Sequence, residues 1–92
     1  FFVKLVKGFN NLYFVYMLIS LDDHRHTYVG YTKNLSQRLK LHNSNKGAKY
    51  TKGRSWKIIY SKKFTSKSEA IKNEYKSKKN YLLRRRIKNK EL

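Results

Sequence analysis

This chain of 92 residues has no cysteine, no proline and only five acidic residues. Without cysteine it forms no disulfide and offers no thiolate ligand, which excludes disulfide-stapled domains and cysteine-bound zinc folds. Catalysis with two metal ions needs several converging carboxylates, and so few acids argue against it. One divalent ion on one carboxylate, completed by water and a substrate phosphate, fits the composition better.

Long apolar segments are also missing. The longest apolar run, Leu12–Ile19, is far below the ~20 residues that a membrane-spanning helix needs. The first eight residues are too short and too interrupted by lysine for a signal peptide. The chain does not begin with Met, so we expect its start to lie upstream or to be processed. These features predict a cytoplasmic protein without a membrane partner.

Positive charge is in large excess. The 23 Lys and Arg residues give a formal net charge of +18 at pH 7. A domain with this charge repels itself and is commonly compensated by a polyanion, so nucleic acid is the first partner to consider, with salt-sensitive binding. A solvated surface explains any single lysine but not the sum. The hydrophobic fraction of 39%, with eight Tyr and five Phe, is sufficient for one small globular domain.

The pattern of apolar residues predicts three strands. Residues 12–19 form a continuous apolar run typical of a central strand, and residues 26–31 form a second strand that completes an antiparallel hairpin. If the turn centres near Asp22, Tyr16 lies opposite Tyr28, and both hydroxyl groups share one face of the sheet. The third strand begins at Trp56, which we expect to be a core residue.

A helix is predicted directly after the second strand. Gly30 marks a tight turn, and Asn34 is the expected N-cap of a helix that runs to about Ser44. At about 100° per residue, His42 falls among the apolar positions of this helix and Arg38 lies at their margin. Both side chains are therefore expected on the inner face.

A later helix carries the most informative acid. Residues 66–69 match the Ser-x-x-Glu capping box. One face of this helix carries, in angular order, Ala70, Glu74, Lys78, Ile71 and Tyr75. Glu74 therefore lies inside the apolar arc, between Ala70 and Ile71. A carboxylate on an inward arc costs free energy unless a cation, a metal ion or hydrogen bonds meet it. The simpler interpretation is an ion pair with Lys78, worth only about 0.2–0.5 kcal/mol.

The other candidate residues also have structural interpretations. Tyr16 and Tyr28 are ordinary strand residues, but a phenol beside a cation can help to activate water. Arg38 is either a margin residue or a planar clamp for phosphate, and His42 is either a hydrogen-bonded core residue or a proton relay. The Asp and His residues within 22–26 lie in the hairpin turn and are assigned a structural role.

Together these residues resemble the GIY-YIG nuclease superfamily, and most of all its small stand-alone, bacterial-type, UPF0213-like branch. Residues 14–16, Phe-Val-Tyr, stand where the family has Gly-Ile-Tyr, and residues 28–30, Tyr-Val-Gly, where it has Tyr-Ile-Gly. Arg38 and His42 match the following helix, and Glu74 matches the metal-binding glutamate of a later one.

The resemblance implies an α+β fold, a small three-stranded antiparallel β-sheet flanked by helices. It implies metal-dependent hydrolysis of DNA phosphodiester bonds, specific for structure rather than sequence, in DNA repair or processing; RNA is an alternative substrate. One Mg²⁺ or Mn²⁺ ion would bind Glu74. Tyr28 would act as the base, with His42 as a relay. Tyr16 would orient water or phosphate, and Arg38 would stabilise charge on the phosphate.

The resemblance covers residues 12–79, which we expect to be the nuclease domain, preceded by an extension over 1–11 and followed by a basic helical tail over 80–92. Two positions depart from the family pattern. Phe14 replaces the first glycine. Many family nucleases also have an asparagine after the metal-binding glutamate, and in this chain the corresponding position falls near Arg86, so the asparagine is missing.

Further contacts to nucleic acid are expected from basic and aromatic residues of the loops, the first helix and the tail. These are Lys33, Arg38, Lys49, Tyr50, Lys52, Arg54, Arg84 and Arg85. Tyr50 and Trp56 could also stack on unpaired bases. The alternative function is a non-catalytic, basic nucleic-acid-binding module, and a third option is a nuclease fold that acts only with a protein partner. A monomer is expected.

Overall fold

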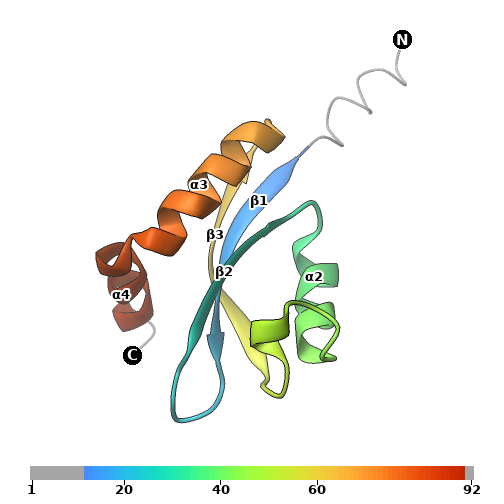
Figure 1. Ribbon diagram of the computed structural model, residues 1–92, viewed down its shortest axis with the longest axis vertical. Helices are drawn as coiled ribbons and strands as arrows, with labels where there is room; N and C mark the ends of the chain where they lie inside the picture. The colour runs from blue at the N-terminus through green and yellow to red at the C-terminus, as the bar shows by residue number, and fades with distance from the viewer. Residues whose placement is uncertain (1–11, 91–92) are drawn as a thin grey trace.

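The computed structural model describes residues 12–90, and in them three antiparallel strands form a sheet with helices on both faces (Figure 1). The elements are β1 (Tyr13–Ser20), β2 (Thr27–Thr32), α2 (Leu35–Asn43), the 3₁₀ turn η1 (Lys49–Thr51), β3 (Trp56–Phe64), α3 (Lys67–Lys79) and α4 (Tyr81–Lys90). The strand order β2-β1-β3 makes β1 the central strand. The α+β prediction is confirmed, whereas the extension predicted over 1–11 lies outside the described residues.

Alternation along β1 divides the core into two layers. Val15 and Met17 face α3 and pack with Ala70 of that helix. Tyr16 and Leu18 face the other way and pack with Trp56 and with α2. All the residues from Val15 to Ser20 are buried, as expected for a strand covered on both faces.

The hairpin register differs from the prediction by two residues. Tyr16 pairs with Gly30, and Tyr28 pairs with Leu18, so the turn centres on Asp23. A shift of two residues leaves every side chain on its own face, whereas a shift of one would reverse them. Tyr16 and Tyr28 therefore share a face as predicted, with ring centroids 6.5 Å apart.

The first helix has the predicted limits, but the connection that leads into it from β2 differs from the prediction. The side chain of Asn34 accepts a hydrogen bond from the backbone N–H of Gln37 at 3.1 Å, as an N-cap does. The tight turn expected at Gly30 is wrong, because Gly30 lies inside β2 and the strand continues to Thr32. The far end of α2 is fixed to β3 by Asn43, which exchanges hydrogen bonds of 2.6 and 3.1 Å with the backbone of Trp56.

The inner face of α3 is rotated relative to the prediction. Ser66 caps the helix, accepting from the backbone N–H of Glu69 at 3.3 Å. Ile71 and Tyr75, placed on the inner arc, are 40% and 58% exposed, so that placement is wrong. The buried positions of α3 are Ala70 and Ser77, an i,i+7 pair that brings partly buried positions 73 and 74 inward with them.

The C-terminal helix α4 completes the layer formed by α3. Asn80 opens it by accepting a hydrogen bond from the backbone N–H of Leu83 at 2.9 Å. Ile87 packs against the cluster of Val15 and Met17. In the described part of the chain, no helix is long and apolar enough to cross a membrane.

Candidate active site

A hydrogen bond between two buried side chains lies at the centre of the candidate site. The Tyr16 hydroxyl, on the α2 face of β1, lies 2.8 Å from Nε2 of His42. Tyr16 is 2% exposed and His42 is not exposed at all, so this polar pair is enclosed by the core. The predicted inward position of His42 is confirmed.

The second nitrogen of His42 is held by Thr51 in η1. Nδ1 lies 2.8 Å from the Thr51 hydroxyl, which donates its own proton to the carbonyl oxygen of Ala48 at 2.9 Å. Since a hydroxyl has one proton to donate, Thr51 accepts from Nδ1–H. Nε2 then carries the free lone pair and accepts the hydrogen bond from Tyr16. The arrangement fixes one neutral tautomer of His42.

Two glycines make room for this pair. A Cβ atom built on Gly30 would lie 2.6 Å from the Tyr16 hydroxyl oxygen and 3.1 Å from Cε2 of Tyr28. A Cβ on Gly47 would collide with the His42 ring. Gly30 is therefore required by the close approach of Tyr16 rather than by a turn.

Burial, more than any neighbouring charge, favours the neutral state of Tyr16 and of His42. Burial raises the pKa of Tyr16, partly opposed by a hydrogen bond and by the positive charge of Arg38. Burial also lowers the pKa of His42, and the positive charge of Arg38 lowers it further. Nε of Arg38 is shielded from solvent and has no hydrogen-bond partner among residues 12–90. Arg38 is thus close to Tyr16 and His42 and retains donor capacity for an anion.

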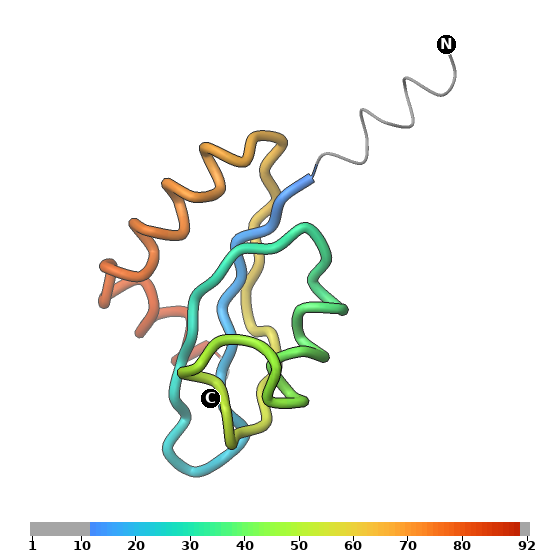
Figure 2. Tube along the Cα trace, turned by 45° about the vertical axis from the view of Figure 1, so that its right-hand side comes forward, coloured from blue at the N-terminus to red at the C-terminus, as the bar shows by residue number. Residues whose placement is uncertain are grey.

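Tyr28 lies beside the same histidine but faces an open pocket. Its ring centroid is 5.2 Å from that of His42 and 6.0 Å from that of Tyr50, on which it stacks. The loop that carries η1 folds back beside β2 to make this contact (Figure 2). Tyr28 and Tyr50 line a pocket of about 200 Å³ together with Lys78 and Arg84. The surroundings of Tyr28 are therefore accessible from solvent, while the Tyr16 hydroxyl is turned inward.

Glu74 approaches this group from the opposite layer, around the edge formed by β2. Its side chain is 18% exposed, and its carboxylate oxygen Oε2 lies 3.6 Å from Nζ of Lys78, the i,i+4 partner. Nζ of Lys78 in turn lies 5.9 Å from the Tyr28 ring centre. Among residues 12–90 no hydrogen bond or ion pair joins Glu74 to Tyr28, so Lys78 stands between them. The negative charge of Glu74 still contributes to the raised pKa of Tyr16.

Glu74 fits a metal ion that is shared with a substrate. Within residues 12–90 no three His, Asp or Glu side chains come together as a closed metal site would need. A carboxylate oxygen is nevertheless a suitable ligand for a hard divalent cation, and Mg²⁺ is often held by one or two carboxylates, water and substrate phosphate. Such an ion would have to displace Lys78 from the carboxylate.

The other predicted contact residues are more scattered. Lys33 lies over the Tyr13 ring at 5.5 Å, and Arg54 pairs with Asp22 of the hairpin turn at 3.2 Å. Trp56 is buried, and its Nε1–H donates to the Thr51 carbonyl at 2.9 Å, which confirms a core role. Lys49 and Lys52 are exposed on either side of Tyr50. Arg84 and Arg85 of α4 line a pocket beside the β1–β2 turn, and Arg84 also lines the pocket of Tyr28.

Sequence reasoning gave no role to Thr51, Gly47 or Lys88. A role for Thr51 could have been inferred, because a buried histidine needs an acceptor to fix its tautomer. The 3₁₀ turn η1 places the Thr51 hydroxyl beside His42. The need for glycine at position 47 comes from the close approach of the His42 ring, which no local sequence pattern indicates. The role of Lys88, in the pocket beside α4, depends on how α4 packs and has no local signal.

Comparisons with known proteins agree with the resemblance described above. The family model of the GIY-YIG catalytic domain matches residues 12–89. A UPF0213 protein of Oceanobacillus iheyensis is 48% identical over 67 residues, covering 72% of this chain and 76% of that protein. One of Lactiplantibacillus plantarum is 47% identical over 66 residues, covering 68% and 63%. The solution NMR structure of a UPF0213 protein from Bacillus halodurans is 40% identical, with coverage of 73% and 70% and a TM-score of 0.44.

Proposed function

This chain belongs to the GIY-YIG family, and from that premise we propose that it is a metal-dependent nuclease that hydrolyses phosphodiester bonds of DNA. One observation carries the proposal. The site brings together Tyr16 of β1, Tyr28 of β2, and Arg38 and His42 of α2. Tyr16 and His42 are joined by a hydrogen bond, and the charge of Glu74 acts on Tyr16. Such a set offers a base, a phosphate clamp and a metal ligand.

Tyr28 is the base in this proposal, because it lines the open pocket while the Tyr16 hydroxyl is committed to His42. Tyr28 would give up its hydroxyl proton to solvent in the open pocket and then, as the phenolate, take a proton from the attacking water. The hydrogen-bonded Tyr16 and His42 would keep Tyr28 and the phosphate in fixed orientations. Arg38, with an unpaired buried Nε, would bind a phosphate oxygen as negative charge develops on it.

Glu74 would hold one Mg²⁺ or Mn²⁺ ion. When bound, that ion would supply charge neutralisation at the scissile phosphate and the leaving oxygen. Lys78 would then be released toward the Tyr28 ring and the phosphate, both of which favour a cation.

The substrate is proposed to be selected by structure rather than by sequence. The exposed groups near the site are Lys, Arg and the stacked Tyr50, which bind phosphates and base faces rather than base edges. Damaged, branched or single-stranded DNA would suit such a surface, and repair or processing of DNA is the proposed process.

A non-catalytic nucleic-acid-binding module is the second candidate. It is favoured by the ion pair between Glu74 and Lys78, which already neutralises the carboxylate without a metal ion. In that case the charge of +18 does the binding, and Glu74 only anchors a lysine.

Hydrolysis assays with a matched pair of variants separate the two candidates. We would incubate the protein with supercoiled, single-stranded and branched DNA in Mg²⁺, Mn²⁺ or EDTA, and compare Glu74→Gln with Glu69→Gln. Both variants remove one negative charge from α3, but Glu69 is exposed in the first turn. The nuclease proposal expects metal-dependent cleavage that falls at least about 100-fold in Glu74→Gln and persists in Glu69→Gln.

Equal cleavage by wild type and Glu74→Gln, or cleavage by neither, would refute the catalytic assignment. The binding-module candidate expects no cleavage, and unchanged or tighter DNA binding by both variants because a negative charge is lost.

A further inference from the structure

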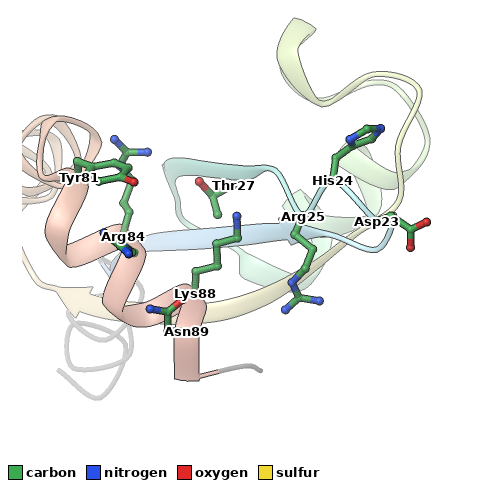
Figure 3. A pocket seen from close by; sticks show the side chains of 9 residues that line it. Asp23, His24, Arg25, Thr27, Tyr81, Arg84, Lys88 and Asn89 are labelled. Atoms are coloured by element: carbon green, nitrogen blue, oxygen red, sulfur yellow. The ribbon is translucent and has the colours of Figure 1, made fainter.

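A basic pocket of about 440 Å³ lies between the β1–β2 turn and α4, apart from the group around His42 (Figure 3). Its cations come from two distant parts of the chain: Arg25 from the turn, and Arg84, Arg85 and Lys88 from α4. The pocket has one acidic residue, Asp23, whose side chain points away from α4 (Figure 3). The volume lies within the range of small-ligand sites in proteins.

Two guanidinium groups of this pocket have unpaired buried atoms. Nε of Arg25 and Nε of Arg84 are both shielded from solvent, and neither has a hydrogen-bond partner among residues 12–90. A buried charged donor without an acceptor is costly, so such donors are normally paired. Because both arginines line one pocket, the ligand chemistry that suits this pocket is an acceptor-rich anion.

The backbone at Arg25 is held in an unusual conformation. Its φ is 51°, in the left-handed region that favours glycine or asparagine. The Asp22 side chain holds the turn by accepting hydrogen bonds of 3.2 Å from the backbone N–H groups of His24 and Arg25. A strained residue kept in place by its surroundings is a frequent mark of a functional position.

The basic pocket adjoins the pocket of the proposed base. Thr27 and Arg84 line both this pocket and the one that contains Tyr28 and Tyr50. A nucleic-acid strand lying against Tyr28 would therefore bring a neighbouring phosphate toward Arg84 and Lys88.

We propose that the pocket between the β1–β2 turn and α4 binds a phosphate group of the nucleic-acid strand, next to the phosphate at Tyr28. The inference rests on nucleic acid as the substrate in the proposed function, and it does not require hydrolysis. Phosphate is the anion that suits the site, because arginine guanidinium groups bind its oxygens in pairs. Either a backbone diester or a terminal monoester supplies this chemistry.

Binding in EDTA tests the pocket independently of cleavage. We would measure the affinity and its salt dependence for a single-stranded oligonucleotide, with and without a 5′-phosphate, using wild type and the double variant Arg25→Asn/Lys88→Ala. Asparagine tolerates the positive φ at position 25. The control is Lys63→Ala/Lys72→Ala, which removes two exposed charges from β3 and α3, outside the pocket. Thermal unfolding checks that all variants fold.

The pocket variant should bind about tenfold more weakly than the control, and its salt slope should fall by about one further unit. An equal loss on both oligonucleotides identifies a backbone phosphate, and a loss confined to the phosphorylated one identifies a terminal phosphate. The same affinity and slope in the pocket variant and the control would overturn the proposal, because charge number alone would then explain binding. Cleavage without this difference would leave only the nuclease proposal standing.

Discussion

The two faces of the sheet are built by different interactions. On the α2 face, Tyr16, His42 and Thr51 form a buried hydrogen-bonded series enclosed by aromatic rings. On the α3 face, Val15 and Met17 meet apolar side chains. Ser77 is the buried polar side chain of α3, and the charged Glu74–Lys78 pair lies at the rim of that layer, where it is partly exposed.

The two faces are therefore suited to different tasks, one to fixing the positions of side chains and the other to binding charged groups. A buried hydrogen-bonded network fixes ring orientations, because every unmade bond inside it is costly. A partly exposed pair such as Glu74 and Lys78 can exchange partners at little cost, because water screens it. The α2 face is therefore suited to hold geometry, and the rim of the α3 face is suited to receive a phosphate or a metal ion.

The largest effect is expected from removing the shared member of the network. His42→Ala would leave a cavity and deprive Tyr16 and Thr51 of their partner, and should lower the free energy of unfolding by about 3 kcal/mol. Ser77→Ala, at a buried position of α3 whose hydroxyl makes one long contact of 3.4 Å, should cost under about 1 kcal/mol. Urea unfolding measures both. Equal losses would break the contrast between the two faces.

A single added methyl group tests how tightly the α2 face is packed. Gly30→Ala would push the Tyr16 ring away and should cost about 1–3 kcal/mol, together with a large loss of any cleavage. The control is Gly53→Asn, where φ is +82° and a Cβ atom meets nothing within 4 Å. Unfolding and cleavage are measured for both variants. A stable, fully active Gly30→Ala protein would contradict the packing seen here.

The two tyrosines should respond differently to loss of the hydroxyl. Tyr16→Phe leaves Nε2 of His42 unpaired and should cost about 1–2 kcal/mol of stability. The Tyr28 hydroxyl makes no hydrogen bond within residues 12–90, so Tyr28→Phe should change stability by under about 0.5 kcal/mol, while abolishing cleavage if Tyr28 is the base. Parallel unfolding and cleavage assays decide this. Active Tyr28→Phe protein would exclude the base assignment.

The smallest effect is a pH dependence of stability that belongs to His42. Its pKa in the folded protein lies below the ordinary value of 6.5, so the unfolded chain binds more protons between the two values. Its contribution to stability should be complete above about pH 6.5 and decline as the pH falls toward the folded pKa. Urea unfolding from pH 8 to pH 5, compared with His42→Gln, isolates this contribution. Identical slopes would contradict a buried neutral histidine.

The sequence was sufficient for the features that local chemistry determines. The apolar run of β1, the Asn34 cap and the inward face of α2 follow from residue type and spacing, and all three were correct. The central position of β1 in the sheet followed from its fully apolar run. The shared face of Tyr16 and Tyr28 was correct although the register was not, because an even shift preserves the face.

The remaining errors depend on tertiary structure. The turn has the expected length but lies one residue later, over 21–26. Within it Arg25 adopts a positive φ, which a sequence without glycine or asparagine at that position does not predict. Ala70 was correctly predicted on the inner face of α3, but Ile71 and Tyr75 were not. The sheet packs against the small side chains of Ala70 and Ser77, which allow α3 to approach closely. The role of Gly30 could not be predicted, because it depends on the tertiary contact with the Tyr16 ring.

The central position of β1 has a consequence for the protein during its synthesis. β1 is synthesised before the other two strands, but it pairs with both of them. The pairing of Tyr16 with Ser61 can therefore form only after β3 has left the ribosome. A hairpin of two strands is marginally stable by itself, and the sheet can therefore close only late in translation. Glu74 follows later still. A chain still attached to the ribosome thus carries positive charge that attracts nucleic acid before the residues proposed for cleavage can meet.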